Sequence, residues 1–382
     1  MTPQNNIKSH VKRPHFKNLD ALRFLAASSV FIFHFFSDLK SFIPISEDNF
    51  LYKSITLFTS KGLLGVNFFF VLSGFLITYL ILFEIKHKKS FNIKHFLIRR
   101  TLRIWPLYFI IICIGFFIFP LLFSDYETKH HIVNYFFFLA NFDEIWYGAN
   151  DSINFLTSPW SVAVEEQFYL IWGVLLFGLS KLKKLNLNTL IILLLIISFI
   201  FRLQNYTELR IIYYHTLSVM PDILIGASLG YSYFKKSEWI ERLKKLTKLK
   251  IVMIYSFGFI LILLKTLLFS NYLIVFERYI IALFFAFILL DQIHFKNSFF
   301  KIGEIKLFNH LGKISYGIYM YHLVVLFVLQ KLMVLFIQEL NLNNYIAIII
   351  YFISGILGTY VLSLISYHSI EKPILTLKKR FN

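Results

Sequence analysis

Residues 63–84 read LLGVNFFFVLSGFLITYLILFE, an apolar stretch whose only charged residue is its last one. A helix of this length rises about 33 Å, which is enough to cross a hydrocarbon core of about 30 Å. Similar stretches recur along the chain, and we place ten of them at residues 20–38, 63–84, 104–123, 160–180, 187–203, 213–234, 251–270, 273–292, 311–337 and 345–370. The pattern predicts an all-α polytopic membrane protein with about ten transmembrane helices.

These stretches also define the domain organisation. We expect a cytoplasmic tail over residues 1–19, one transmembrane domain over 20–370 and a second cytoplasmic tail over 371–382. No small-residue cleavage site follows the first stretch, so we interpret it as a retained helix rather than a signal peptide. Residues 124–159 form the one long outer loop, which is acidic and aromatic. Within this loop, 132–142 is too short to span, and we expect a helix lying at the membrane surface.

The composition excludes several classes of protein. Of the 382 residues, 57% are hydrophobic and 16% are charged, whereas soluble domains have about 45–50% apolar and about 25% charged residues. A soluble enzyme and a disordered chain are therefore excluded. The single cysteine, Cys113, excludes an internal disulfide framework.

The basic residues predict the orientation in the membrane. Of the 39 Lys and Arg residues, nine lie in the alternate loops and 29 lie in the stretches 1–19, 85–103, 181–186, 235–250, 293–313 and 371–382. Basic residues gather in cytoplasmic loops, so both termini are predicted to be cytoplasmic. The net charge of +18 is explained mostly by this bias. It is spread over short loops rather than one face, and we therefore expect no nucleic-acid partner.

The first helix carries two ionisable residues on one face. Arg23 and His34 are eleven residues apart, a turn of about 1100° and a rise of about 16 Å. Asp20 lies one turn before Arg23 and is placed to pair with it. Arg23 is either an anchor at the membrane surface or part of a site. His34 is either a hydrogen-bonded core histidine or a general base.

Two further helices carry charged groups that suit chemistry. Arg100 and Arg103 are neighbours on one face, and guanidinium groups bind phosphate well, although positive-inside charge also explains them. Glu165 and Glu166 lie in the outer half of the fourth helix, where two carboxylates are costly and point about 100° apart. The ninth helix carries His322, for which a structural and a catalytic role are equally supported. The sequence contains no metal-binding motif, and we expect no metal.

Six fragments in this order resemble the acyltransferase-3 family of bacterial membrane O-acyltransferases. The resemblance covers nearly the whole chain, and it rests on Arg23 with His34, Phe69-Phe70-Val71-Leu72-Ser73-Gly74-Phe75-Leu76-Ile77, Arg100 with Arg103, Trp160-Ser161 through Glu165-Glu166-Gln167-Phe168-Tyr169, Ser315-Tyr316-Gly317-Ile318-Tyr319 with His322, and Glu371-Lys372-Pro373. The sixth helix fits loosely, because Ile223 stands where an aromatic residue is common in the family.

The resemblance implies an O-acetyltransferase in the bacterial cytoplasmic membrane. Such an enzyme moves an acyl group, usually acetyl, from cytoplasmic acyl-CoA to a hydroxyl of an extracytoplasmic glycan or lipid-linked sugar. Some relatives carry a fused hydrolase-like C-terminal domain, which we do not expect here. By the same resemblance, Ser315 and Tyr316 join the donor-binding residues.

A mechanism follows as a hypothesis. Arg100 and Arg103, with Arg23, would hold the phosphates of CoA, and His34 would take the proton of the acceptor hydroxyl. Glu165 or Glu166 would orient His34. The oxyanion would receive a hydrogen bond from Tyr169 or Ser161. Direct transfer and an acyl-His34 intermediate both remain open, as do the acceptor, the acyl chain length and the oligomeric state.

Two alternatives to an acyltransferase are considered. A flippase or transporter for a glycan or small anion would also place Glu, His and Arg in the membrane. No inverted repeat supports it, and a requirement for acyl-CoA distinguishes the two. A non-catalytic scaffold would tolerate the loss of His34 and Glu165 together.

Overall fold

The computed structural model describes residues 14, 16, 18–39, 50–148, 155–181, 186–340 and 343–381. These residues form helices and connecting turns, and no strand occurs among them. Helices long and apolar enough to cross a membrane are found at eight places in this part of the chain: Asn18–Leu39, Tyr52–Lys88, Ile93–Leu122, Phe155–Lys181, Leu187–Gln204, Asn271–His294, Ser315–Ile337 and Asn344–Leu377. The prediction of an all-α polytopic membrane protein is confirmed.

Two of the ten expected spans do not meet this description. Helix α13 (Lys248–Leu263) has 16 residues, about 24 Å of rise, and α11 (Thr216–Lys235) carries Pro221 and Asp222. The count of ten, and the cytoplasmic position of the termini, therefore stay predictions. The remaining helices of the described chain are α1 (Asn18–Leu39), α2 (Phe50–Thr59), α3 (Leu64–Lys88), α4 (Ile93–Cys113), α5 (Phe119–Leu122), α6 (Ile132–Phe136), α7 (Ala140–Tyr147), α8 (Pro159–Lys181), α9 (Leu187–Gln204), α10 (Leu209–Tyr214), α12 (Glu238–Leu243), α14 (Lys265–Leu268), α15 (Ile274–His294), α16 (Lys306–Lys313), α17 (Ser315–Leu340), α18 (Asn344–Ser366) and α19 (Lys372–Leu377).

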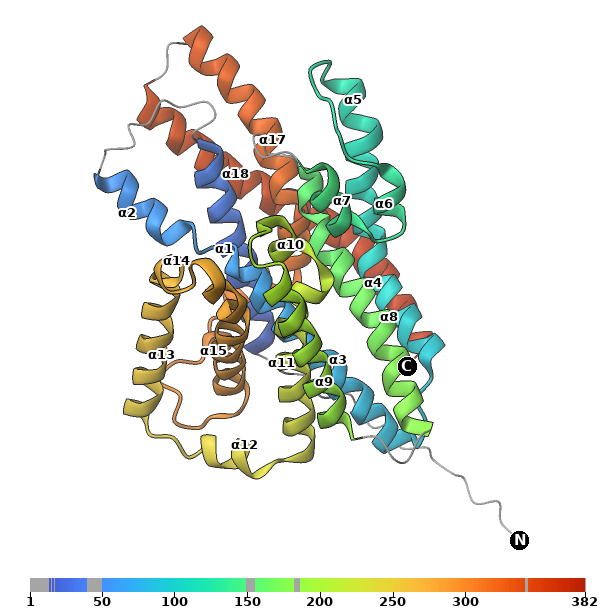
Figure 1. Ribbon diagram of the computed structural model, residues 1–382. Helices are drawn as coiled ribbons and strands as arrows, with labels where there is room; N and C mark the ends of the chain where they lie inside the picture. The colour runs from blue at the N-terminus through green and yellow to red at the C-terminus, as the bar shows by residue number, and fades with distance from the viewer. Residues whose placement is uncertain are drawn as a thin grey trace.

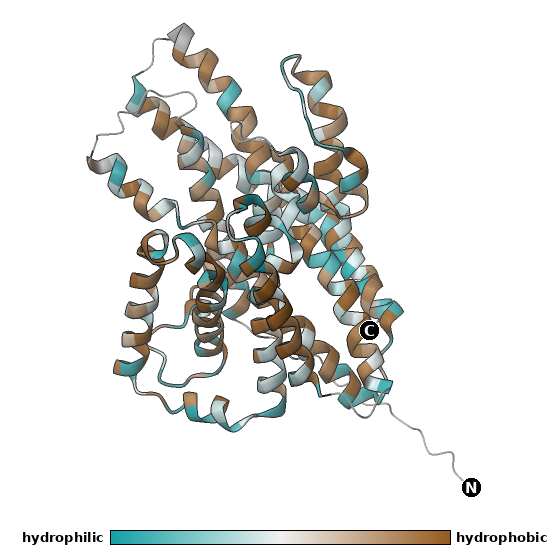
Figure 2. Ribbon diagram, in the orientation of Figure 1, coloured by the Kyte–Doolittle hydropathy of each residue, from teal (hydrophilic) through white to brown (hydrophobic). Residues whose placement is uncertain are grey.

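Helices α1, α3 and α11 form the centre of the bundle, with α13 and α15 on one side and α4 and α8 on the other (Figure 1). We call the end at which α1 begins the basic end, because the lysine- and arginine-rich stretches 85–103, 235–250 and 293–313 lie there. Apolar residues dominate the long helices, and hydrophilic ones gather at turns and helix ends (Figure 2). Large apolar side chains face outward on α9 and α18, as a lipid environment requires.

Helices α3 and α11 cross in backbone contact. A Cβ atom on Gly74 would lie 1.9 Å from the carbonyl oxygen of Ile223, and one on Gly226 would lie 2.0 Å from that of Val71. Only glycine fits at such a crossing, which is typical of close helix packing in membranes. This close contact fixes the position of α11, and of its polar residues, relative to α3.

The third transmembrane helix starts earlier than the sequence analysis predicts. Helix α4 begins at Ile93, and the side chain of Asn92 caps it by accepting a hydrogen bond from the His95 amide at 3.0 Å. Arg100 and Arg103 therefore lie two to three turns inside the helix rather than at its start at residue 104. The expected boundary was wrong because the basic cluster is typical of a loop, whereas Arg99 is buried in an ion pair with Glu84 at 2.8 Å.

The loop segment 132–142 contains two short helices instead of the single helix expected. Helix α6 ends before Phe138, whose φ of 55° breaks the helix, and α7 follows. The buried carboxylate of Asp143 joins the segment by accepting hydrogen bonds from Asn134 at 2.6 Å and from the His131 amide at 3.1 Å. These polar contacts hold the two short helices of the loop together.

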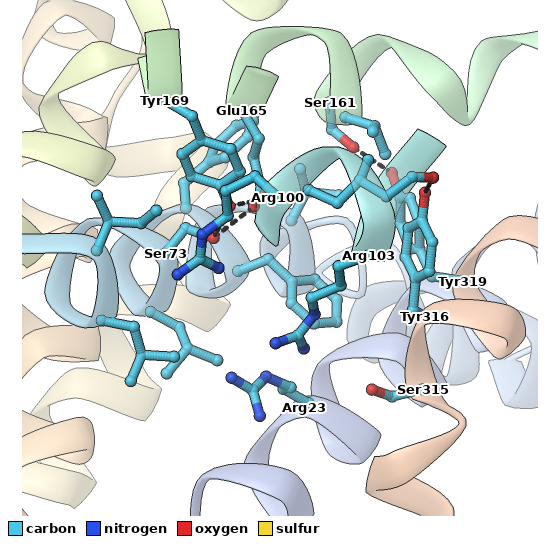
Figure 3. Close-up of a pocket in the computed structure, with 18 residues that line it drawn as sticks. Arg23, Ser73, Arg100, Arg103, Ser161, Glu165, Tyr169, Ser315, Tyr316 and Tyr319 are labelled. Atoms are coloured by element: carbon cyan, nitrogen blue, oxygen red, sulfur yellow. Dashed lines mark hydrogen bonds between the residues drawn. The ribbon is translucent and has the colours of Figure 1, made fainter. Parts of the chain in front are cut away.

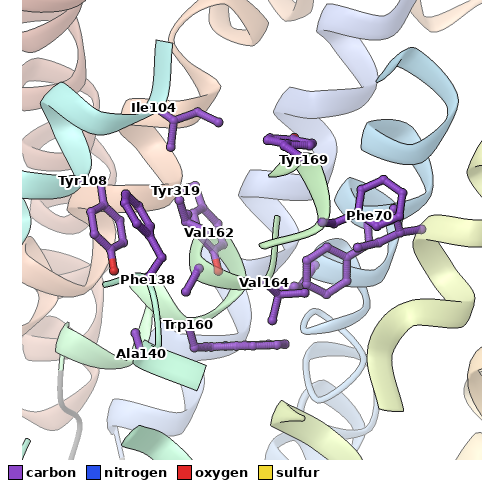
Figure 4. Close-up of a cluster of buried hydrophobic side chains, with 14 of the residues drawn as sticks. Phe70, Ile104, Tyr108, Phe138, Ala140, Trp160, Val162, Val164, Tyr169 and Tyr319 are labelled. Carbon is purple, nitrogen blue, oxygen red and sulfur yellow. The ribbon is translucent and has the colours of Figure 1, made fainter. Parts of the chain in front are cut away.

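Aromatic side chains form the core where α3, α4, α8 and α17 meet (Figure 4). The Phe70 ring meets Trp160 edge-on at 5.8 Å, and Tyr108 stacks on Phe138 at 4.5 Å. Such pairs add about 0.5–1.5 kcal/mol each beyond the burial of their surface. This core holds α8 and α17 firmly around the cavities described next.

Candidate active site

Seven of the nine predicted site residues line a single cavity. They come from four helices (Figure 3) and are Arg23, Arg100, Arg103, Glu165, Tyr169, Ser315 and Tyr316. The sequence analysis took these residues from motifs far apart in the chain, and folding brings them together. We call this space the arginine cavity.

The arginine cavity has an excess of positive charge. Figure 3 shows three guanidinium groups directed into it, and the Arg23 group pairs with Asp20 at 2.6 Å. Neither Arg100 nor Arg103 forms an ion pair with any residue that the structure describes; Arg100 lies over the ring of Tyr169 at 5.5 Å. Guanidinium groups without carboxylate partners, inside a partly apolar cavity, are suited to bind an anion.

Glu165 belongs to the arginine cavity and does not orient His34. Its carboxylate accepts hydrogen bonds from the Ser73 hydroxyl and the Tyr169 hydroxyl, each at 2.7 Å, and these two hydroxyls lie 3.0 Å apart. The expected contact with His34 is therefore wrong for Glu165. Helix α8 packs on α3, α4 and α7, whereas α1 packs chiefly on α16, α17 and α3. Glu165 and His34 accordingly line different cavities.

Glu166 lies on another face of α8. Its carboxylate accepts a hydrogen bond from the Trp105 indole at 3.1 Å, and it does not line the arginine cavity. The turn of about 100° between adjacent residues separates it from Glu165, as the sequence predicts. The expectation that Glu166 is the residue contacting His34 is wrong as well.

A second cavity, of about 540 Å³, contains His34. We call it the histidine cavity. Its wall includes Asn67 of α3, Trp160 of α8, Tyr213 and Tyr214 of α10, and His322 of α17. The centroids of the His34 and His322 rings are 5.2 Å apart. The structure thus places His34 beside a second histidine rather than beside a glutamate.

His322 has a defined donor and acceptor arrangement. Its Nδ1 lies 2.5 Å from the carbonyl oxygen of Tyr319. A carbonyl oxygen only accepts, so Nδ1 carries the proton and the lone pair of the neutral ring is on Nε2. Nε2 is buried and has no hydrogen-bond partner among the described residues. His322 was not among the nine predicted site residues, although a histidine inside a spanning helix is a signal that could have indicated it.

The two cavities share part of their walls. Val66 of α3 and Tyr319 of α17 line both. The Tyr319 hydroxyl bonds to Ser161 Oγ at 2.7 Å and to the Ser158 carbonyl oxygen at 3.3 Å. Arg23 lines one cavity and His34 the other, on the same helix about 16 Å apart. The two cavities therefore adjoin at Val66 and Tyr319.

Buried polar residues that the sequence analysis did not assign to the site surround the histidine cavity. Asp222 pairs with Arg278 at 2.5 Å and accepts a hydrogen bond from Asn67 at 3.1 Å. Arg202 is fully buried, and its guanidinium donates to the Val275 carbonyl oxygen at 3.0 Å. Arg202 and Arg278 are two of the nine basic residues that the charge count assigned to the alternate loops. Both lie within helices, Arg202 in α9 and Arg278 in α15.

Comparison with known proteins places this architecture in a family. The profile of the acyltransferase-3 family, described as an acyltransferase domain, matches residues 16–367. The chain belongs to the acyltransferase-3 family. The region of this acyltransferase domain contains all nine predicted site residues, and both cavities lie within it.

Relatives of this acyltransferase domain are longer than the chain. A putative O-acetyltransferase of Staphylococcus aureus (strain COL) is 27% identical over 98% of this chain and 59% of its own length. The O-acetyltransferase OatA of Staphylococcus aureus (strain NCTC 8325 / PS 47) is 29% identical over 82% of this chain and 53% of its own length. The chain thus spans less than two thirds of these relatives. No solved structure matches the chain.

Proposed function

We propose that this protein is an O-acyltransferase of a bacterial cytoplasmic membrane. In this proposal it transfers an acetyl group from cytoplasmic acyl-CoA to a hydroxyl of an extracytoplasmic saccharide. One observation carries the proposal: the arginine cavity and the histidine cavity meet at Val66 and Tyr319. The first suits a phosphorylated donor, and the second holds two bases. Family membership and the relatives named O-acetyltransferases support the same reaction.

The arginine cavity is the proposed donor site. Arg100 and Arg103, which have no described carboxylate partner, bind phosphate groups of CoA, and Arg23 adds a third guanidinium. Ser315 and Tyr316 line the same cavity from α17. A pantetheine arm held there extends toward Tyr319 and presents its thioester at the shared wall.

The histidine cavity is the proposed site of proton transfer. The acceptor hydroxyl gives its proton to His34 while its oxygen forms a bond to the thioester carbonyl carbon. The carbon–sulfur bond then breaks, and the CoA thiolate takes the proton back from His34. General base catalysis of this kind contributes about 10²–10⁴-fold to the rate.

The oxyanion formed in this reaction needs a hydrogen-bond donor near the shared wall. Ser161 and Tyr319 bond to each other at 2.7 Å at that wall and are suited to this role. Tyr169, the other candidate from the sequence, lines the arginine cavity but not the shared wall. We therefore assign the oxyanion role to the Ser161–Tyr319 pair and a donor-site role to Tyr169.

Labelled acetyl-CoA tests the proposal. Membranes that contain the native protein are incubated with acetyl-labelled acetyl-CoA and native envelope, and the label is followed into lipid and glycan fractions. We expect transfer by the native protein and none by His34→Ala, while both proteins insert and bind CoA equally. Transfer that survives in His34→Ala would remove His34 from the mechanism. Movement of a saccharide across the membrane without acyl-CoA would support a transporter instead.

A further inference from the structure

An apolar groove runs beside the histidine cavity. It lies between α1 and α3 on one side and α13 and α15 on the other, with a volume of about 760 Å³. Its wall is almost wholly apolar and includes Leu25, Ala26, Phe68, Phe259, Ile262 and Phe285. Along α1 the groove extends from Leu22 to Ser29, a rise of about 10 Å. Its shape and chemistry suit a long hydrocarbon chain.

The turn between α2 and α3 forms a border of both spaces. Ser60 and Leu63 line the histidine cavity, Lys61 and Gly62 line the groove, and Leu64 lines both. This turn is held against α1, since a Cβ atom on Gly62 would lie 2.1 Å from the Ser29 carbonyl oxygen. The groove and the histidine cavity are therefore neighbours at a fixed, tightly packed boundary.

The boundary carries positive charge. Lys61 is the charged residue of the groove wall, and its ammonium group forms no ion pair with the described residues. It interacts electrostatically with Lys265 and Glu277, which line the histidine cavity and pair with each other at 2.8 Å. Two lysines thus face one carboxylate where the apolar groove adjoins the polar cavity. An anionic group placed there would neutralise the excess charge.

We propose that the acceptor is a saccharide joined through a phosphate to a long lipid chain. The chain lies in the groove, the phosphate lies at Lys61 and Lys265, and the saccharide enters the histidine cavity beside His34. This inference rests on the proposed function and narrows it. A polysaccharide free of lipid would use the polar cavity and leave both the groove and Lys61 without a role.

Binding of a polyprenyl phosphate tests this directly and needs no acyl transfer. The full chain in nanodiscs is titrated with polyprenyl phosphate, with the uncharged polyprenol and with phosphatidylglycerol, and bound lipid is counted by native mass spectrometry. Two variants probe the site, Ile262→Trp in the groove wall and Lys61→Ala at the boundary. Their matched controls are Ile197→Trp, exposed on α9, and Lys129→Ala, exposed near α6; neither residue lines a cavity described above.

We expect Lys61→Ala to weaken polyprenyl phosphate binding about tenfold and to leave polyprenol binding unchanged, because one charge-assisted contact is lost. Ile262→Trp should weaken binding of both lipids. The controls should bind like the native chain. Equal binding by Ile262→Trp and Ile197→Trp, or equal competition by phosphatidylglycerol, would overturn the proposal and indicate an ordinary annular lipid.

A transfer assay separates this inference from the proposed function. With labelled acetyl-CoA and envelope lipids, the native chain should label the lipid-linked fraction, and Ile262→Trp should lose this label. Suppose that Ile262→Trp labels a lipid-free saccharide to the same extent as the native chain. This result would support acyl transfer and contradict the lipid-linked acceptor. If polyprenyl phosphate bound as expected but neither the native chain nor any variant transferred acetyl, the lipid-binding site would be supported and the proposed acyl transfer would be contradicted.

Discussion

The ring of His322 lies 5.2 Å from that of His34, and the Nε2 atom of His322 is buried without a partner in the described chain. The bond between its Nδ1 and the Tyr319 carbonyl oxygen, 2.5 Å long, fixes the ring so that Nε2 carries the lone pair. The two histidines come from α1 and α17 and line the same cavity. His322 is therefore placed to accept a hydrogen bond from the acceptor hydroxyl or from His34.

Replacing His322 tests this relationship. We expect His322→Ala to lower kcat by about 10²-fold, because a fixed base atom beside His34 is lost, and to leave the KM for acyl-CoA unchanged. Steady-state transfer of labelled acetyl measures both constants. The matched control is His310→Ala, since His310 is exposed on α16 and lines neither cavity. A kcat that is the same in both variants would assign His322 a packing role.

Replacing Arg100 in the arginine cavity is expected to change the KM for acyl-CoA rather than kcat. We expect Arg100→Ala to raise the KM for acyl-CoA about tenfold and to leave kcat nearly unchanged, because the contact binds donor and transition state alike. The increase should shrink as salt is added, since ions screen the attraction to phosphate. Lys94→Ala, an exposed residue on the same helix, is the control. A KM that is unchanged in Arg100→Ala would reject the phosphate-binding role.

The contacts of Glu165 predict which kinetic constant changes when this residue is replaced. Because it bonds to Ser73 and Tyr169 in the donor cavity, Glu165→Gln should change the KM for acyl-CoA and lower kcat by less than about tenfold. An orienting carboxylate for a catalytic base contributes far more, about 10⁴-fold in serine proteases. The same assay applied to Glu166→Gln gives the comparison. A loss of kcat of the larger size in Glu165→Gln would contradict the assignment.

Relationships within one helix follow from the sequence, whereas contacts between helices do not. Arg23 and His34 lie on one helix, so their shared face and their separation follow from helix geometry alone. The contact of Glu165 depends on how α8 is rotated against α3 and α4, and no local pattern specifies that rotation. The separation of Arg23 and His34 along α1 was therefore predictable from the sequence, and the partner of Glu165 was not. His322 shows the same limit, because its neighbour belongs to a helix nearly 300 residues away in sequence.

Charged residues near helix ends were the second source of error. The positive-inside rule treats Lys and Arg as markers of loops. For this reason the helix was predicted to start at residue 104, whereas α4 begins at Ile93. It also counted Arg202 with a loop, although its guanidinium is fully buried and satisfied by backbone carbonyl oxygens such as that of Val275. A charge that is satisfied inside a bundle has the same sequence signature as a charge in solvent.

The outer loop offers a test through pH. Burial raises the pKa of the Glu144 carboxyl, against the attraction of His130, so the folded state holds the proton more tightly than the unfolded state. The stabilising contribution of this proton is complete below the ordinary glutamate pKa of about 4.3 and is lost as the pH rises through the raised value. Glu144→Gln should therefore raise the apparent Tm at pH 8 and change it little at pH 4. Thermal unfolding in nanodiscs at both pH values measures this, with the exposed Glu127→Gln as control. A larger gain at pH 4 than at pH 8 would reverse the sign and contradict the assignment.

The shared wall of the two cavities carries the most specific prediction. Val66 is 3% exposed and lines both cavities, so a larger side chain at this position fills the space between them. We expect Val66→Phe to abolish acetyl transfer while CoA still binds in the arginine cavity and the acceptor still binds in the histidine cavity. Val66→Ala keeps the space open and serves as the control, although the lost methyl groups reduce stability modestly. Gel filtration shows that both variants fold, and separate binding titrations with CoA and with acceptor check each cavity. Transfer at the native rate in a folded Val66→Phe would mean that the acyl group crosses from donor to acceptor by another route.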